Sequence, residues 1–157
     1  MSRQLLNAAI LDKPYLQSPV DDLLSFYYVS QWAAVNNTKD FPEPTAPTAV
    51  PDELKLLRQR LGRSEREDAT STITQDFLDE KSYGAFLVAC QPILQEWYEQ
   101  LRKLMVAWQV RTKNLDQAVA QQYATYYPLF REFTDRGVLE LLQLVQSHFV
   151  GGLKGLA

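Results

Sequence analysis

Apolar residues recur every three or four positions along most of this chain, which is the spacing of one face of an α-helix. No stretch alternates apolar and polar residues over six positions between turn residues, as a half-buried β-strand would. The pattern therefore predicts an all-α fold, a helical bundle of about five helices with an ordered proline-rich connector.

Residues 1–37 are expected to form N-terminal helices, the first of them short and covering about residues 2–11. The second is expected to begin after Ser18, because Pro19 suits the first helical position and Asp21 stands three residues after the cap. This is the arrangement of a reciprocal capping box, which satisfies free backbone N–H groups at a helix start.

Residues 38–51 form the predicted connector, with four prolines in the ten residues from Pro42. Proline lacks a backbone N–H and restricts the residue before it, so this density excludes both a helix and a central strand. Phe41 is the only large apolar residue of the connector. We expect its ring to dock against the rest of the chain or against a partner.

Residues 52–157 form the predicted main bundle. In order, its expected elements are a helix over 52–62, a polar loop or one loose turn over 63–73, a long helix from Thr74 or Ser82 to Asn114, a helix from Asn114 or Asp116 to Phe130, and a last helix from Asp135 to Gly151. Trp97 and Trp108 share one face of the long helix and are expected in the core, and Pro92 predicts a kink.

The last helix is expected to be capped by Asp135 and ended by the Gly151-Gly152 pair. Its apolar residues at helical spacing are interpreted as a buried stripe. They are Val138, Leu141, Leu142, Val145 and Phe149.

With 157 residues, the chain has the length of a single helical domain. No apolar run reaches the roughly 18 residues that cross a bilayer, and the N-terminus lacks the core of a signal peptide. These features predict a cytoplasmic protein without a membrane segment. One cysteine, Cys90, and one histidine, His148, exclude an internal disulfide and a zinc site, and we expect no metal and no cofactor.

Catalytic groups are scarce as well. His148 is interpreted as a cation near the C-terminal end of the last helix, and Cys90, which stands among apolar residues, as a small core residue. Glu96 and Glu99 lie three apart without a matching histidine, and the glycines form no phosphate-binding loop. The sequence therefore predicts a protein that is not an enzyme.

Charge is segregated into two basic islands, although the net charge is -3. Residues 100–115 contain four bases and no acid. On a helix these bases fall within about half of the circumference, opposite the tryptophan face, with Val106 and Val110 between them. The four bases are Arg102, Lys103, Arg111 and Lys113. Such a mixed face suits a partner interface or a phosphate-tracking groove, and an ordinary solvated face is the alternative.

Arginine dominates the second island, over residues 54–66. Its guanidinium group matches phosphate or carboxylate in a bidentate fashion. Arg58 and Arg63 are the candidates for such contacts, while Arg66 has acidic neighbours that can neutralise it.

A short all-α chain with basic islands on outer helix faces and a polar connector resembles the small subunit of CRISPR effector complexes. The resemblance is architectural and covers mainly residues 82–150. It implies a non-catalytic subunit of a ribonucleoprotein complex, in one or more copies, that binds other subunits and stabilises the guide-target duplex or the displaced strand. For this sequence it implies backbone contact by Arg102, Lys103, Arg111 and Lys113, joined by Arg58 and Arg63.

A helical adaptor or assembly factor that binds only protein is the alternative function. Its contact surface would consist of Val106, Val110 and the connector with Phe41. The salt dependence of nucleic-acid binding separates the two hypotheses, because phosphate contacts release counterions.

Overall fold

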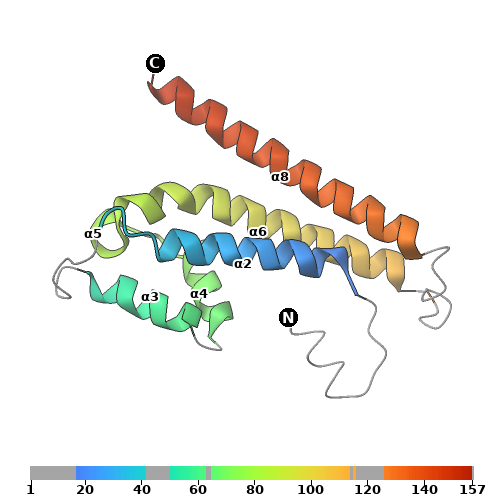
Figure 1. Ribbon diagram of the computed structural model, residues 1–157, viewed down its shortest axis with the longest axis horizontal. Coiled ribbons are helices and arrows are strands. Elements are labelled where there is room, and N and C mark those ends of the chain that lie inside the picture. The colour runs from blue at the N-terminus through green and yellow to red at the C-terminus, as the bar shows by residue number, and fades with distance from the viewer. Residues whose placement is uncertain (1–16, 42–49, 63–64, 114, 116–125, 157) are drawn as a thin grey trace. The chain divides into compact units, whose positions relative to one another are not determined.

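The structure is a computed structural model that describes residues 17–41, 50–62, 65–113, 115 and 126–156. Among these residues it contains six helices and no strand, which confirms the all-α prediction (Figure 1). The helices are α2 (Pro19–Val35), α3 (Asp52–Gly62), α4 (Arg66–Gln75), α5 (Glu80–Tyr83), α6 (Ala85–Thr112) and α8 (Tyr126–Leu156). The expected helix over 2–11, connector residues 42–49 and residues 116–125 lie outside the described residues.

The start of α2 has the predicted capping box. The Ser18 hydroxyl accepts a hydrogen bond from the backbone N–H of Val20 at 3.1 Å, and the N–H of Ser18 donates to the Asp21 carboxylate at 3.4 Å. These bonds satisfy backbone donors that the first helical turn leaves without partners.

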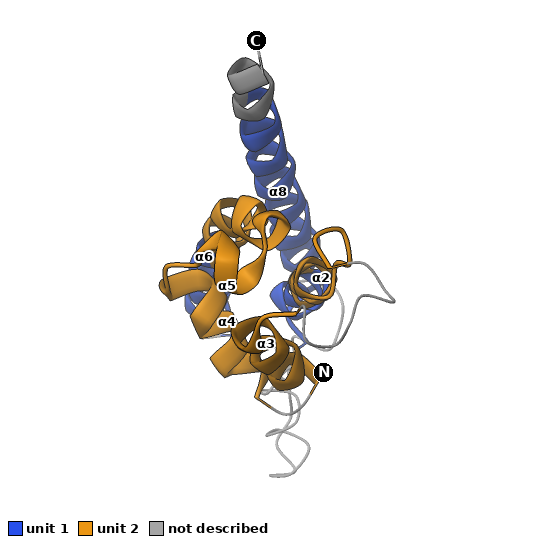
Figure 2. Ribbon diagram, turned by 90° about the vertical axis from the view of Figure 1, so that its left-hand side faces the viewer, with its two compact units in different colours: residues 1–26, 99–157 blue, residues 27–98 orange. Residues whose placement is uncertain are grey.

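The described chain divides into two compact units, coloured separately in Figure 2. Unit 1 consists of residues 1–26 and 99–157, and unit 2 of residues 27–98. Helices α2 and α6 each supply residues to both units. The single domain expected from the chain length stays a prediction.

The prediction of a polar loop or one loose turn over 63–73, in unit 2, is wrong, because residues 66–73 belong to α4. Ala69, Thr70 and Ile73 lie on one side of α4 and are buried. The amide of Gln31 donates to the Thr70 hydroxyl at 3.0 Å, also in the buried interior. Burial of one short face, with a hydrogen-bonded threonine, outweighs the weak helix propensity of a Ser- and Thr-rich segment.

The predicted long helix is interrupted at Gly84, so α5 and α6 are separate elements. Gly84 has a φ of +86°, which L side chains rarely adopt, and a Cβ there would lie 2.7 Å from the Asp40 carboxylate. That carboxylate accepts a hydrogen bond from the N–H of Phe86 at 2.7 Å and so caps the start of α6. Asp79 caps α5 by accepting from the N–H of Ser82 at 2.9 Å.

Unit 1 is organised around Trp108, whose prediction as a core residue is confirmed. The rings of Tyr126, Phe130 and Phe133 meet its indole edge-on, with centroids 6.2, 6.4 and 5.3 Å away. Edge-to-face packing of this kind is favourable beyond the area it buries. Trp97, in unit 2, is buried as predicted too and packs against Tyr27 at 5.3 Å.

Helix α8 differs from the prediction at both ends, since it begins at Tyr126 and continues to Leu156. Asp135 therefore does not cap it, and the Gly151-Gly152 pair does not end it. Pro128 lies in its first turn, where a missing N–H costs nothing.

The predicted buried stripe of this helix is also wrong. Val138, Leu142, Val145 and Phe149 are exposed and Leu141 is half-buried, whereas Leu129, Phe133 and Leu144 are buried. The first turns of α8 lie before Asp135 and already pack, since Phe130 and Phe133 contact Trp108. These contacts and the close approach at Gly137 determine which face of α8 is buried.

Candidate interaction surface

The second half of α6 presents a mixed apolar and basic face to the outside. Arg102, Lys103, Val106, Val110 and Lys113 are all exposed, and together they are called the α6 outer face. At about 100° per residue they fall within an arc of about 100°, with the valines between Arg102 and Lys103. Val106 and Val110 are 59% and 69% exposed.

This face is a consequence of the opposite side of α6. Leu101, Leu104 and Trp108 are buried there at helical spacing, which fixes the rotation of the helix. The two valines, one turn apart, therefore point away from the interior of unit 1.

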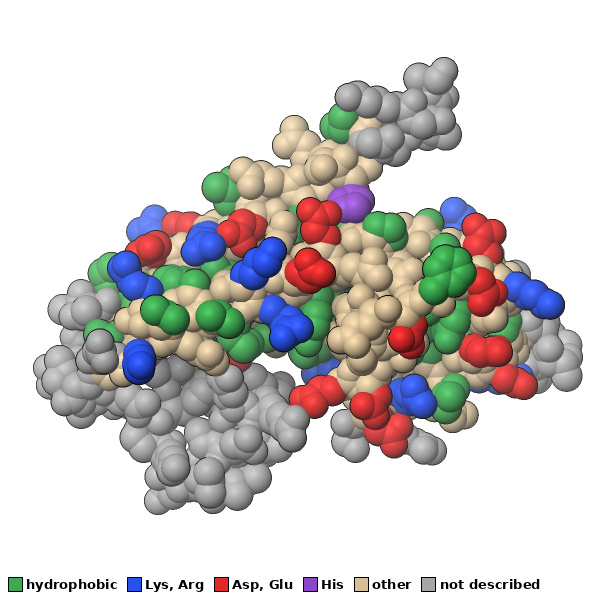
Figure 3. All heavy atoms as spheres, turned by 180° about the vertical axis from the view of Figure 1, so that it is seen from behind, with side chains coloured by type: hydrophobic (Ala, Val, Ile, Leu, Met, Phe, Trp, Pro, Cys, Tyr) green, Lys and Arg blue, Asp and Glu red, His purple; other side chains and the backbone are tan. Residues whose placement is uncertain are grey.

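Three cations of the α6 outer face have no hydrogen bond or ion pair with any described residue. They are Arg102, Lys103 and Lys113. Glu99 lies in the same arc and is exposed too. On the side of the molecule in Figure 3, Lys and Arg side chains lie among Asp, Glu and hydrophobic side chains, so no continuous basic surface forms there.

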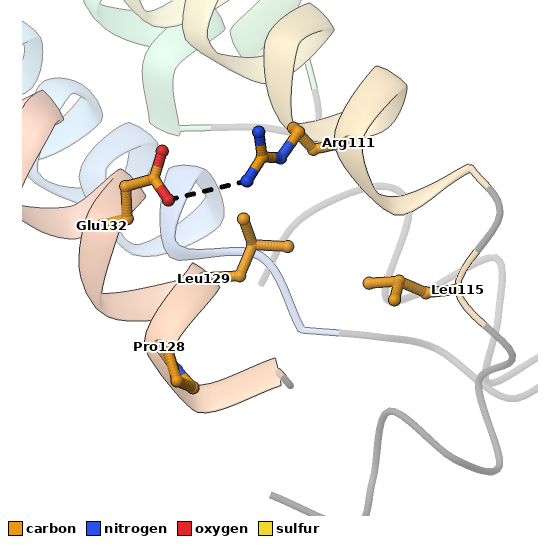
Figure 4. A pocket seen from close by; sticks show the side chains of 5 residues that line it. All are labelled: Arg111, Leu115, Pro128, Leu129 and Glu132. Carbon is orange, nitrogen blue, oxygen red and sulfur yellow. Dashed lines mark ion pairs between the residues drawn. The ribbon is translucent and has the colours of Figure 1, made fainter. Parts of the chain in front are cut away.

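Arg111 lies about 80° beyond Lys103 around the helix and so outside this face, and the phosphate contact predicted for it together with the other three bases stays a prediction. Its guanidinium reaches Glu132 of α8, with an N···O distance of 3.8 Å (Figure 4). The pair is largely exposed and contributes little stability. It lines a hollow of about 320 Å³ together with Leu115, Pro128 and Leu129.

Arg58 is used inside unit 2 and does not lie free for phosphate, which corrects the second basic island. Its side chain donates to the carbonyl oxygens of Val35 at 3.0 Å and Asn37 at 3.3 Å. Val35 is the last residue of α2 and Asn37 lies two positions beyond it, at a helix end where acceptors are left without partners. Arg66 stacks over the Tyr28 ring, with its Cζ 4.9 Å from the centroid. Arg63 lies outside the described residues.

Phe41, predicted to dock against the rest of the chain or against a partner, is half-buried and faces its own chain. Its Cε2 atom lies beside Gly84, so that a Cβ at Gly84 would be 3.1 Å away. The N–H of Phe86 donates to the Asp40 carboxylate next to Phe41. Together, Asp40 and Phe41 fix the first residues of the connector to the start of α6. No sequence signal marked Asp40 as the cap of a helix that begins 45 positions later.

Cys90 and His148 are the side chains that could act as a nucleophile and as a base. Cys90 is half-buried, and burial raises the pKa of its thiol, which disfavours the reactive thiolate. His148 is half-buried within α8, about two turns before Leu156, so it lies near the C-terminal end of the helix but not in its last turn.

Groups of three or more metal-binding side chains do not occur among the described residues. In the same part of the chain, no helix is both long and apolar enough to span a membrane. Comparison with protein-family models, with curated proteins and with solved structures gave no match to this chain.

Proposed function

We propose that this chain is a non-catalytic helical subunit of a larger assembly that binds another protein through the α6 outer face. The observation that carries the proposal is the exposure of Val106 and Val110 between cations that have no described partner. Burial raises the pKa of the Cys90 thiol, which argues against this thiol as a nucleophile.

The composition of the face supports a protein partner. Interfaces between proteins combine an apolar centre with a polar rim, and arginine is enriched in them. Val106 and Val110 would supply the centre, and Arg102, Lys103 and Lys113 the rim. A fitting partner has an apolar patch bordered by carboxylates.

Contact with a nucleic-acid backbone is the second candidate. It is favoured by Arg102, Lys103 and Lys113, which have no ion pair with any described residue and are spread over about 16 Å along α6 and just past its end. This is the contact that a CRISPR small subunit would make, and the resemblance to that family remains a hypothesis. We favour the protein partner, because two valines occupy the middle of the face and Glu99 would repel phosphates.

A comparison of two variants of the full chain tests the proposal. Val106→Ser with Val110→Ser removes the apolar centre, and Arg102→Gln with Lys103→Gln and Lys113→Gln removes the charge. The chain is pulled down from a nuclease-treated lysate of the cells that produce it. The serine variant is then expected to lose the partner. The glutamine variant should retain it in a less salt-sensitive way. Ala89→Ser, at an exposed position in the first half of α6 and outside the α6 outer face, is the matched control.

The nucleic-acid hypothesis gives a different result. Nuclease would then release every captured protein, and purified chain would bind RNA or DNA with an affinity that falls steeply with salt. The glutamine variant would flatten that dependence by about 0.7–0.9 units of log-log slope per lost contact, while the serine variant would bind like the natural chain. This outcome would contradict the protein-binding proposal.

A further inference from the structure

Over residues 129–150, helix α8 is apolar on two sides, and the described residues cover only one of them. Leu129, Phe133, Gly137 and Leu144 form the buried side. The other side is called the α8 seam. It consists of Val138, Leu142, Val145 and Phe149, which are 43%, 61%, 45% and 66% exposed.

The spacing of the seam indicates a helix as its occupant. Its residues are separated by four, three and four positions, the alternation with which two α-helices pack side by side. At about 100° per residue the seam is centred about 145° from the buried side. On one side α8 therefore packs against α2 and α6 within unit 1, and on the other side it offers a second surface to another helix.

The lack of charged residues around the seam argues against charged binding partners. Residues 141–153 contain no Asp, Glu, Lys or Arg. The nearest charges before this stretch, Arg136 and Glu140, pair with each other at 2.8 Å. A nucleic acid or a strongly charged peptide would find no complementary group here, whereas an equally apolar helix would.

The seam is complementary to itself when two copies run antiparallel about a two-fold axis between Leu142 and Val145. Leu142 of one copy then faces Val145 of the other, and Val138 faces Phe149. Each layer pairs a larger side chain with a smaller one, which keeps the volume of the layers even. A parallel pair would instead place Phe149 against Phe149 and Val138 against Val138.

The area available suits a weak dimer. With the flanking Leu139, which is also exposed, five side chains contribute. Together they expose on the order of 450 Å² per copy, taking about 150–250 Å² for a whole aromatic side chain as the scale. A pair would bury about 900 Å², the size of a weak or transient interface.

We infer that the α8 seam binds the α8 seam of a second copy of this chain in an antiparallel arrangement. The inference is independent of the proposed partner of the α6 outer face, since the two surfaces share no residue.

Sedimentation equilibrium of the full chain tests it. We expect the mass to rise with concentration from 18.0 kDa toward twice that value, with a dissociation constant on the order of 10–100 µM. Leu142→Glu should weaken the dimer at least about tenfold, because it places a carboxylate in the apolar layer. Gln143→Glu, exposed on the same helix but outside the seam, is the matched control and should leave the dimer intact.

A pair of double variants tests the orientation. Leu142→Glu with Val145→Glu places like charges in the central layers. Leu142→Glu with Val145→Lys places opposite charges there only when the copies are antiparallel. The second variant should therefore dimerise measurably more strongly than the first. Equal loss in both would overturn the antiparallel arrangement.

Other outcomes overturn the inference as a whole. A chain that remains monomeric at about 1 mM, or a dimer that Leu142→Glu does not weaken, would do so. Binding of a monomer to phosphatidylcholine vesicles, lost in Leu142→Glu, would assign the seam to a lipid surface instead. Val106→Ser with Val110→Ser should leave the dimer unchanged, so failure of the proposed function and failure of this inference are distinguishable.

Discussion

Gly137 of α8 lies directly against Leu23 of α2, with less room between them than a methyl group requires. A Cβ at Gly137 would overlap the Leu23 Cδ1 atom and lie 3.0 Å from Cδ2 of Leu104. Three helices of unit 1 meet at this glycine, so its missing side chain sets how closely α8 approaches α2 and α6.

Gly137→Ala should therefore destabilise the protein. Alanine favours a helix by about 1 kcal/mol over glycine, but forcing a methyl group into a packed core costs about 1–3 kcal/mol. We expect a net decrease in the free energy of unfolding, measured by urea denaturation. Gly62→Ala is the control, because nothing lies within 4 Å of a Cβ there. It should be neutral or slightly stabilising, and a stabilising effect of Gly137→Ala would contradict the close contact.

Trp108→Ala should be among the most destabilising single changes in unit 1. The indole is buried and touched by three aromatic rings, so its removal leaves a large cavity. Losses of about 3–5 kcal/mol are usual for such a change. Trp32→Ala, at an exposed tryptophan, is the matched control and should cost far less. Equal effects of the two substitutions would show that Trp108 is not a core residue.

Local signals in the sequence predicted local structure well. Ser18, Pro19 and Asp21 predicted the start of α2, because a capping box involves only neighbouring residues. The tryptophan face of α6 was likewise predicted from its spacing. Asp135 and Gly151, however, are cap-like residues that stand inside α8. A cap signal is overridden where tertiary contacts hold the helix together on both sides of it.

Contacts between distant residues account for what the sequence did not predict. Helix α4 is held by Thr70, whose partner Gln31 lies 39 positions earlier. Arg58 was expected at an outer surface, but its guanidinium donates a hydrogen bond to the carbonyl of Val35, which lies 23 positions earlier. The rotation of α8 was predicted wrongly because both of its faces are apolar, and periodicity alone cannot say which one packs.

Thr70→Val should lower the free energy of unfolding by about 1–3 kcal/mol. The shapes of the two side chains match, but valine leaves the buried amide of Gln31 without the hydroxyl that accepts its hydrogen bond. Thr72→Val is the control, because the hydroxyl of Thr72 only donates to the Asp68 carbonyl in an exposed position. It should change stability by less than about 0.5 kcal/mol.

A double-mutant cycle separates this hydrogen bond from other effects. Gln31→Met replaces the buried amide by an apolar side chain of similar length. Combined with Thr70→Val, it should cost less than the sum of the two single changes, since no unsatisfied polar group remains. Strict additivity in urea denaturation would contradict the coupling of Gln31 with Thr70.

Tyr27 should make the protein sensitive to alkaline pH. Its side chain is fully buried, and its hydroxyl has no hydrogen-bond partner among the described residues. Burial, helped by the neighbouring Tyr98 and Tyr28, raises the pKa of Tyr27 well above its ordinary value of 10.0. In the unfolded chain the phenol loses its proton near pH 10, while the folded chain still holds it. The unfolded state then binds fewer protons, so stability falls as the pH rises above about 10.

Tyr27→Phe should reduce this alkaline loss and leave stability at neutral pH unchanged or higher by about 1 kcal/mol, because it removes a buried polar group without a partner. Urea denaturation at several pH values between about 7 and 11 measures both effects. Part of the loss should persist, since burial also raises the pKa of Tyr28, Tyr83 and Tyr126. Tyr127→Phe, at an exposed tyrosine, is the control. If Tyr27→Phe destabilises the protein at neutral pH, the Tyr27 hydroxyl has a partner, and the account of its raised pKa by unrelieved burial is wrong.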